Sequence, residues 1–211
     1  MSVAGEGALA TVALFTRAPV RGRVKTRLAA VIGEDAALAL HRALLERAVS
    51  ALRDAPDFDL VLHLDGNAAT LPPWRLPVAV QSDGDLGARM AAAIAAITGR
   101  GRIAVVVGGD CPGLEARHVR AAVRAVRDGA DVALCPAEDG GYVLIAMARL
   151  HRRVFEDVEW GTARVLDQTR ARAREAGIVL TELDTLWDVD TATDLARYRG
   201  LMAQSRDVRS S

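Results

Sequence analysis

The chain of 211 residues is long enough for one large domain with a substantial core. Its hydrophobic content of 51% and its seven prolines exclude a disordered or collagen-like protein. The 27 basic and 27 acidic residues cancel to a formal net charge of zero, so no overall field attracts nucleic acid, and an aromatic content of 4% argues against base-stacking platforms.

Cysteine and histidine usage argues against a disulfide framework and against a zinc site. The two cysteines are Cys111 and Cys135, and the four histidines are scattered without metal-ligand spacing. Met1 to Gly7 is short and polar and lacks a secretory signal pattern, and no apolar run approaches the roughly 18 residues of a membrane span. We therefore expect a cytoplasmic protein with no membrane span, and a homo-oligomer is compatible with the sequence.

Strand and helix patterns alternate along the first two thirds of the chain. In chain order they predict a strand over 9–15, a helix over 34–54, a strand over 59–64, a short strand over 78–80, a helix over 86–98, a strand over 103–107, a helix over 115–127 and a strand over 132–136. The run 103–107 is continuously apolar and β-branched, as expected for a central parallel strand.

The alternation changes after the strand predicted over 132–136. The apolar run 142–147 follows too soon for a crossover helix, so we expect a strand antiparallel to its neighbours. A helix over 162–176, a strand over 179–183 and an amphipathic helix over 193–204 complete the pattern. We predict a single three-layer α/β/α, Rossmann-like domain over residues 1–204, with a mostly parallel sheet and a mixed edge, and a disordered tail over 205–211.

Five basic side chains stand directly behind the first predicted strand: Arg17, Arg21, Arg23, Lys25 and Arg27. Open α/β sheets bind ligands at the carboxyl ends of their strands, and a bound anion would relieve the mutual repulsion of these cations. A diphosphate suits them, because guanidinium forks match phosphate oxygens and an ammonium supplies a point charge. The segment lacks P-loop spacing, and a solvated basic loop explains the charges equally well.

A carboxylate, Asp110, follows the strand predicted over 103–107. Gly108 and Gly109 precede it and allow the backbone to approach a ligand closely. A carboxylate at the carboxyl end of a central strand suits a hard cation such as Mg²⁺ or Mn²⁺. The structural alternative is a turn residue or a cap for the helix near Glu115.

Two further carboxylates, Asp188 and Asp190, precede the last predicted helix. Residues two apart in an extended segment point to the same side, so the two would form a pair. Asp190, Thr191 or Thr193 would serve equally well as the N-cap of that helix, and one aspartate can cap and coordinate through different oxygens.

Weaker signals come from acidic and aromatic residues in three other segments. Asp85 and Arg89 stand at the start of the helix predicted over 86–98, which is also what an ordinary loop and cap would show. Asp139-Gly140 is a turn pair in any protein, and Trp160 stands in a loop before a predicted helix.

Together these segments resemble the DUF2064 family of the glycosyltransferase-A-like superfamily. The resemblance rests, in chain order, on FTRAPVRGRVKTRL, GDLGARM, GGDCPGL, DGGYVLIA, the stretch from Phe155 to Thr162, and WDVDTATDL. One departure is Gly109, where the family more often has threonine, and loss of that hydroxyl should be minor. The resemblance implies a nucleotide-diphospho-sugar transferase fold, a nucleotide or nucleotide-sugar donor, a small-molecule acceptor, and Mg²⁺ or Mn²⁺.

The resemblance also implies a role for individual residues. Those implied in nucleotide binding are Arg17, Gly22, Lys25, Arg27, Asp85 and Arg89. Those implied in catalysis are Lys25, Asp110 and Asp190, and the implied metal ligands are Asp110, Asp190 and Asp188. Those implied on the acceptor side are Asp139, Tyr142 and Trp160. A metal and the cations would together neutralise charge that develops on the diphosphate during transfer.

Three functions are compatible with these residues. Family usage favours a glycosyltransferase with a nucleotide-sugar donor, although Asp110 stands alone where many sugar transferases have Asp-x-Asp. Asp110, Asp190 and Lys25 also resemble the nucleotidyltransferases exemplified by 2-phospholactate guanylyltransferases, which join a nucleoside triphosphate to a small phosphorylated acceptor. No residue stands out as a general base, which suits a phosphate acceptor. Nucleotide binding without turnover would leave two distant carboxylates unexplained.

Overall fold

The computed structural model describes residues 9–207, with side chains up to residue 204. Its strands are β1 (Ala10–Arg17), β2 (Phe58–Asp65), β3 (Val78–Val80), β4 (Ile103–Gly108), β5 (Val132–Pro136), β6 (Tyr142–Met147) and β7 (Leu180–Glu182). Its helices are α1 (Thr26–Ile32), α2 (Glu34–Leu52), α3 (Leu86–Thr98), α4 (Ala116–Arg127), α5 (Val165–Glu175) and α6 (Ala192–Asp207), with 3-10 helices at Ala68–Thr70 and Arg152–Phe155. Within this range no helix is both long and apolar enough to cross a membrane.

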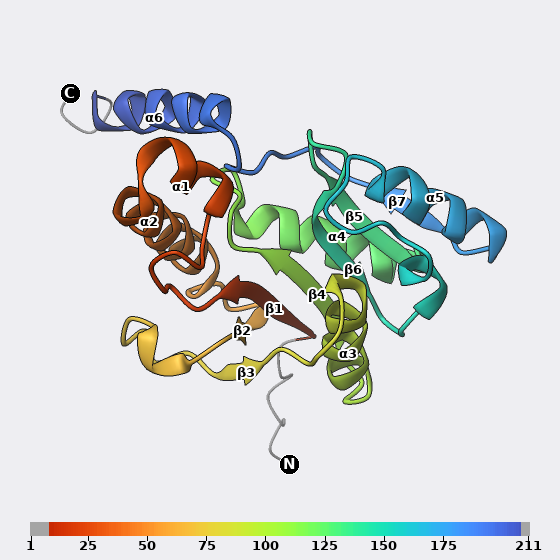
Figure 1. The fold of residues 1–211 in the computed structure, drawn as a ribbon. Helices are drawn as coiled ribbons and strands as arrows, with labels where there is room; N and C mark the ends of the chain where they lie inside the picture. The colour runs from red at the N-terminus through yellow and green to blue at the C-terminus, as the bar shows by residue number, and fades with distance from the viewer. Residues whose placement is uncertain (1–8, 208–211) are drawn as a thin grey trace, which may run out of the picture.

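All seven strands form one sheet in the order β3-β2-β1-β4-β6-β5-β7 (Figure 1). β1 pairs in parallel with β2 and β4, whereas β6 runs antiparallel to both of its neighbours, as predicted. The link 137–141 is too short for the crossover that a parallel neighbour would need. The start of β6 therefore lies at the same edge of the sheet as the ends of β1 and β4.

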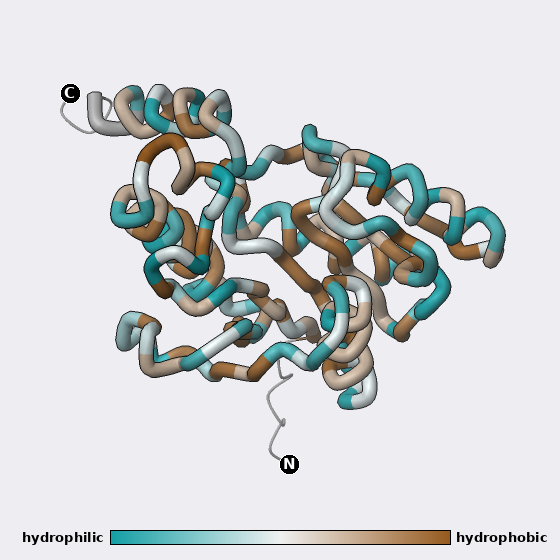
Figure 2. The backbone as a smooth tube through the Cα atoms, in the orientation of Figure 1, coloured by the Kyte–Doolittle hydropathy of each residue, from teal (hydrophilic) through white to brown (hydrophobic). Residues whose placement is uncertain are grey.

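Helices cover both faces of the sheet, which confirms the predicted three layers. Alternate residues of β1 point to opposite faces. Val12 and Leu14 pack in a core with α2 and α4, whereas Ala13 and Phe15 pack in a second core with α3 and α5. Figure 2 shows hydrophobic segments gathered in the sheet and hydrophilic ones along the outer helices and loops.

A third hydrophobic cluster packs α6 against α1 and α2. Leu28 of α1, Leu44 of α2, and Leu195 and Tyr198 of α6 form it together with buried Val189. In Figure 1, α6 lies over α1 and α2. The segment that carries Asp188 and Asp190 is thereby held beside the basic segment after β1.

Most predicted boundaries lie within three residues of those in the structure, and two differences concern the basic segment and the end of the chain. The segment 16–28 is predicted as a loop, but α1 begins inside it at Thr26, because a short helix anchored by Leu28 has too few turns to show a helical period. α6 extends past the predicted end at 204 to Asp207. Residues 208–211 of the predicted tail lie outside the described part of the chain.

A close contact fixes the turn between β5 and β6 against the segment before α5. Gly140 has φ +88°, and a Cβ on it would lie 2.1 Å from the Ala163 carbonyl oxygen. Its own carbonyl accepts a hydrogen bond of 2.8 Å from the Leu166 amide. Because only glycine fits this approach, the turn that carries Asp139 has a fixed position relative to Trp160.

Gly140→Ala should therefore lower the free energy of unfolding by about 3 kcal/mol or more, because the new methyl group collides with backbone at a left-handed position. Gly101→Ala is the matched control, since Gly101 has φ +72° and a Cβ on it would have no neighbour within 4 Å. Gly101→Ala should lower the free energy of unfolding by only about 1 kcal/mol. Urea unfolding followed by circular dichroism measures both losses, and equal losses would contradict the close contact.

Candidate functional site

A cleft crosses the edge of the sheet where β1 and β4 end. It consists of two cavities of about 610 Å³ and about 410 Å³. We call the larger one the charged half and the smaller one the apolar half. Both are lined by Phe15, Arg27, Leu86, Gly108, Gly161 and Asp190.

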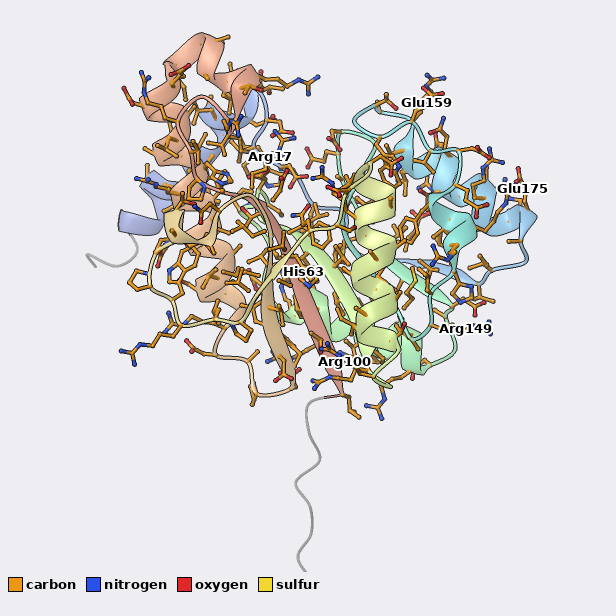
Figure 3. All side chains as sticks on the ribbon, turned by 60° about the horizontal axis from the view of Figure 1, so that its bottom comes forward. Arg17, His63, Arg100, Arg149, Glu159 and Glu175 are labelled. Atoms are coloured by element: carbon orange, nitrogen blue, oxygen red, sulfur yellow. The ribbon has the colours of Figure 1, made fainter. Side chains whose placement is uncertain are left out.

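The position of the cleft is the one that open α/β sheets use for ligands. The chain leaves β1 toward β2 on one side and reaches β4 on the other, so the ends of β1 and β4 flank a topological switch point. Figure 3 shows Arg17 at this end of the sheet and Arg100 at the opposite end.

A buried ammonium group joins three segments at the floor of the cleft. Lys25 Nζ donates to Val189 O at 2.8 Å and to Asp190 Oδ1 at 2.9 Å, and lies 3.0 Å from Asp110 Oδ1. Its side chain is only 4% exposed, whereas the carboxylates are 41% and 44% exposed. Three oxygens thus match the three N–H groups of the ammonium. We call Lys25, Asp110 and Asp190 the Lys25 clamp.

The backbone of Lys25 is in a conformation that side-chain-bearing residues avoid. At φ 47° and ψ 42° it lies in the left-handed region immediately before α1, which costs a non-glycine residue about 1 kcal/mol or more. The contacts of its ammonium group hold it there. The clamp is therefore a point of stored strain, as is common at functional sites.

Lys25 is the only lysine in the chain, and the other basic residues counted in the composition are all arginine. An ammonium is compact and directs its donors tetrahedrally, whereas a guanidinium is planar and broad. The three oxygens around Lys25 Nζ suit the first shape and not the second. The lone lysine is a sequence signal that marks the centre of the site.

Electrostatics favour the charged forms of Lys25 and Asp110. Burial opposes the charge on Lys25, but Asp110 and Asp190 outweigh burial and raise the pKa of Lys25 above its ordinary value. Burial also opposes ionisation of Asp110, but His41 and Lys25 outweigh it and hold the pKa of Asp110 below its ordinary value.

Neither clamp carboxylate serves as a helix cap. Glu115, not Asp110, is the N-cap of α4, and it forms a capping box with His118. At the start of α6, Asp194 Oδ2 accepts from the amide of Thr191 at 2.7 Å, and Thr191 Oγ1 accepts from the amide of Asp194 at 3.3 Å. The interpretations of Asp110 and of Asp190 as caps are therefore wrong, and both carboxylates face the cleft.

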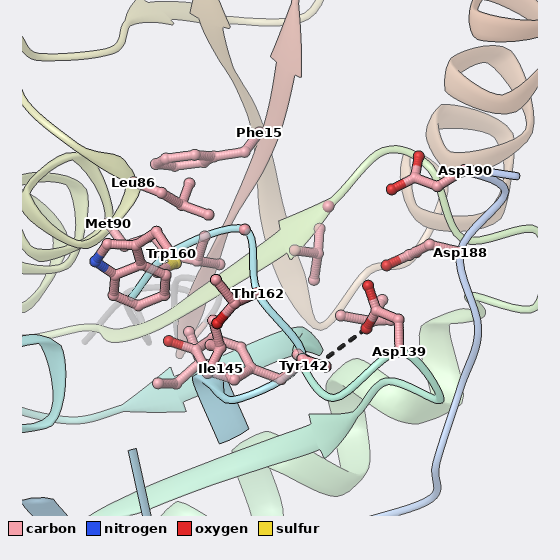
Figure 4. Close-up of a pocket in the computed structure, with 18 of the residues that line it drawn as sticks. Phe15, Leu86, Met90, Asp139, Tyr142, Ile145, Trp160, Thr162, Asp188 and Asp190 are labelled. Atoms are coloured by element: carbon pink, nitrogen blue, oxygen red, sulfur yellow. Dashed lines mark hydrogen bonds between the residues drawn. The ribbon is translucent and has the colours of Figure 1, made fainter. Parts of the chain in front are cut away.

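Asp188 adds negative charge beside the clamp. Burial and nearby carboxylates raise the pKa of Asp188 to about 7. The carboxylates concerned are those of Asp110, Asp190 and Asp139. In Figure 4, Asp188 and Asp190 lie close together at one end of the apolar half, as expected for residues two apart in an extended segment. The attraction of the Lys25 ammonium opposes the rise in the pKa of Asp188 but does not offset it.

This donor set fits a divalent cation that arrives with a phosphate ligand. No group of three or more His, Cys, Asp or Glu side chains among residues 9–204 is arranged to hold a metal by itself. Mg²⁺ is usually bound through one or two carboxylates plus substrate phosphates and waters. Asp110 and Asp190 can supply those carboxylates, and the excess negative charge around Asp188 favours an added cation.

Arginines line the charged half. Arg89 Nη1 donates to Asp65 Oδ2 at 3.0 Å and Arg89 Nε donates to Gly84 O at 2.9 Å. Arg17 is 65% exposed and lies 4.0 Å from Asp65. Arg27 lines both halves. These guanidinium groups retain donors that can face a ligand.

Two other residues expected at the nucleotide have identifiable structural roles. Asp85 caps α3, because its Oδ1 accepts from the Ala88 amide at 2.8 Å, which confirms the cap interpretation, and it also lines the charged half. Gly22 has φ +74° and makes the turn before α1, where a Cβ would lie 3.2 Å from Glu34 Oε1. Gly22 lines neither half of the cleft.

The apolar half brings together the three residues expected on the acceptor side. Asp139, Tyr142 and Trp160 all line it. The Trp160 ring lies 6.3 Å from Tyr142, edge to face. Its indole also packs against the backbone of Gly87, where a Cβ would lie 2.6 Å from the ring. Helix α3 therefore holds Trp160 in the wall.

The sequence did not indicate two further side chains at the site. His41 is 5% exposed, and its Nε2 lies 3.1 Å from Arg17 O while its Nδ1 lies 3.8 Å from Asp110 Oδ1. Gln81 Nε2 donates to Thr16 O at 3.2 Å and to His63 O at 2.7 Å, which ties the ends of β1 and β2 together. Both act through contacts between distant segments, for which the local sequence gives no signal.

Lys25→Met should lower the free energy of unfolding at neutral pH by about 2 kcal/mol, because two half-exposed carboxylates lose a buried partner. The lowered pKa of Asp110 means that this stabilisation is present above the unfolded value of 3.8 and is lost as pH falls through the folded value. The raised pKa of Lys25 preserves it up to at least about pH 10.

Urea titrations across pH measure the difference between wild type and Lys25→Met, which should shrink below about pH 4 and increase as pH rises through about 7, where Asp188 ionises near Lys25. Lys25→Arg should not restore the stability, because a guanidinium does not fit three converging oxygens. Arg21→Met is the control, since Arg21 is 61% exposed, and it should leave the stability close to that of wild type. A pH-independent difference would contradict the clamp.

Comparisons with known proteins agree with the fold. The family model described as "Uncharacterized protein conserved in bacteria (DUF2064)" matches residues 63–162. A protein from Desulfovibrio desulfuricans G20, provisionally assigned as a nucleotide-diphospho-sugar transferase, has a crystal structure that is 32% identical with a TM-score of 0.81. The match covers 89% of this chain and 85% of that one. No curated protein matches the sequence.

Two more distant structures share the fold. CMP:2-keto-3-deoxy-manno-octonic acid synthetase, complexed with CTP, is 17% identical with a TM-score of 0.58, over 93% of this chain and 99% of that one. Rv0371c from Mycobacterium tuberculosis H37Rv, complexed with manganese, is 20% identical with a TM-score of 0.52, over 89% of this chain and 97% of that one. At these identities the likeness concerns the fold alone.

Proposed function

Because the chain belongs to the DUF2064 family of the nucleotide-diphospho-sugar transferase superfamily, we propose that it is a metal-dependent glycosyltransferase that uses a nucleotide-sugar donor. One observation carries the choice of glycosyl transfer. The apolar half is lined by three carboxylates, Asp139, Asp188 and Asp190, and Arg27 is the only cation among the described residues that line it.

In this proposal the nucleoside diphosphate occupies the charged half. Arg17 and Arg27 bind its phosphate oxygens, because their guanidinium forks match pairs of such oxygens. Asp110 and Asp190 hold the divalent cation, which when bound supplies positive charge to the leaving diphosphate. Lys25 keeps the two carboxylates together before the donor arrives.

The glycosyl group lies where the two halves meet, beside Asp190 and Arg27, and the acceptor occupies the apolar half. A phosphorylated acceptor would be repelled by Asp139 and Asp188, whereas a neutral hydroxyl would not. No residue stands out as a general base in the sequence. Asp139 and Asp188 can serve as one, because a carboxylate there can accept the proton of an attacking hydroxyl. This charge distribution favours glycosyl transfer over nucleotidyl transfer to a phosphorylated acceptor.

Thermal unfolding with a panel of nucleotides and nucleotide sugars tests this proposal. With Mn²⁺, a nucleoside diphosphate or its sugar should stabilise the protein by about 2.7 kcal/mol at a concentration of about 100 times Kd, because it binds only the native state. A shift confined to one nucleoside triphosphate would favour nucleotidyl transfer instead. If no nucleotide in the panel shifts the transition, the proposal is wrong.

Asp110→Asn should remove the Mn²⁺-dependent part of the shift, because one of two carboxylate ligands is lost. Asp54→Asn should leave it intact, since Asp54 is 83% exposed and lies outside the cleft. With a donor identified, release of nucleoside diphosphate should fall by about 100-fold or more in Asp110→Asn. A protein that binds nucleotide without turnover would lose affinity only.

A further inference from the structure

The apolar half differs in character between its two ends (Figure 4). Apolar and aromatic side chains line one end, among them Phe15, Leu86, Met90, Ile145 and Trp160. The carboxylates of Asp139, Asp188 and Asp190 gather at the other end, next to the Lys25 clamp. A ligand that matches both ends has an apolar body and a polar group at one extremity.

The size and chemistry of the cavity narrow the class of ligand. Its volume of about 410 Å³ lies in the range of pockets that enclose small organic molecules. A sugar carries hydroxyl groups all around its ring, and each one buried against apolar side chains would lose a hydrogen bond to water. Thr162, which lines the wall, already donates its hydroxyl to Glu159 O at 2.8 Å. The wall also holds two buried side-chain polar atoms without a hydrogen-bond partner among the described residues, Tyr142 Oη and Trp160 Nε1, which are too few for the hydroxyls of a sugar ring. The apolar end therefore suits a body with at most one or two hydroxyl groups.

Contacts within the protein fix the wall of the apolar end. Trp160 packs on Gly87 and Ala163 packs on Gly140, and at both glycines an added Cβ would collide, at 2.6 Å and 2.1 Å. The Phe155 ring also lies beside the indole, at 6.3 Å between ring centroids. Because the wall is fixed at two points, the cavity can select its occupant by shape.

We propose that the acceptor is a neutral alcohol or phenol with an apolar or aromatic body. The body fills the apolar end, and the hydroxyl points toward Asp139 and Asp188. This inference rests on the proposed glycosyl transfer. The hydroxyl oxygen forms a bond to the anomeric carbon of the donor, and the bond from that carbon to the diphosphate oxygen breaks. The nucleoside diphosphate leaves with the bonding electrons, and the hydroxyl proton passes to a carboxylate.

Three probes of matched size or polarity test the inference by isothermal titration calorimetry on the full chain. 2-Naphthol carries an aromatic body and a neutral hydroxyl, 2-naphthyl phosphate carries the same body and a dianion, and glucose carries no apolar body. 2-Naphthol should bind at least ten times more tightly than either of the others. Tighter or equal binding of 2-naphthyl phosphate or of glucose overturns the inference.

Two arginine substitutions locate the binding. Leu86 is 46% exposed at the first position of α3 and lines the cavity, so Leu86→Arg adds a cation there with little risk to folding. Leu86→Arg should weaken 2-naphthol binding at least tenfold. It should also reduce the factor by which the protein binds 2-naphthol more tightly than 2-naphthyl phosphate. Val179→Arg is the control, since Val179 is a 56% exposed apolar residue that does not line the cleft. If both variants and wild type bind 2-naphthol with equal affinity, 2-naphthol does not bind in the apolar half and the assignment of that cavity is wrong.

The outcomes separate this inference from the function on which it rests. If nucleotide sugars stabilise the protein and 2-naphthol does not bind, the proposed function stands and the acceptor class is wrong. If 2-naphthol binds in the manner described but no nucleotide does, the glycosyl transfer fails and with it the identification of the cavity as an acceptor site. Simultaneous binding of 2-naphthol and a nucleoside diphosphate with Mn²⁺ supports both.

Discussion

The buried ammonium of Lys25 connects the parts of the chain that form the cleft. It binds the end of β4 through Asp110 and the segment before α6 through Val189 and Asp190. These segments are far apart in the sequence, and each is a connection that would otherwise be free to move at the surface. The left-handed backbone of Lys25 is tolerated because these contacts over-determine its position. The floor of the cleft is therefore defined before any ligand binds.

The same ammonium explains how the site tolerates so much negative charge. Buried carboxylates without partners would lose much of their hydration, and the raised pKa of Asp188 shows that the compensation by Lys25 is incomplete. In the proposed function, a divalent cation and the arginines of the charged half would complete the compensation when a diphosphate binds. The charge balance would then link cation binding to donor binding, and the carboxylates left in the apolar half would discriminate against an anionic acceptor.

The strand pattern and the order of the elements were predictable because they depend on local periodicity. The continuous apolar run of β4 and the short link to β6 determine a central strand and an antiparallel neighbour. The candidate carboxylates were also predictable, since Asp110 follows a central strand and Asp190 precedes a helix. Their interpretation as caps was wrong because Glu115 and the Thr191–Asp194 pair take the capping positions.

Contacts between distant segments were not predictable from one sequence. His41 occupies an ordinary buried position of α2, and only the tertiary structure brings it near Asp110. The packing of Trp160 on Gly87 depends in the same way on a loop meeting a helix start. Lys25 was expected at the site from the basic segment and the family resemblance, but its being the only lysine in a chain whose other basic residues are arginine was a signal left unused.

That lone lysine permits a direct measurement of the clamp. Protein labelled with ¹⁵N only in lysine has one side-chain ammonium signal in its NMR spectrum. If three oxygens surround Lys25 Nζ in a side chain that is 4% exposed, its protons exchange slowly and the signal is visible at neutral pH. The signal should weaken in Asp110→Asn and shift when a nucleoside diphosphate and Mg²⁺ are added. An ammonium signal lost to rapid exchange in the wild type, as for a solvent-exposed lysine, would contradict the clamp.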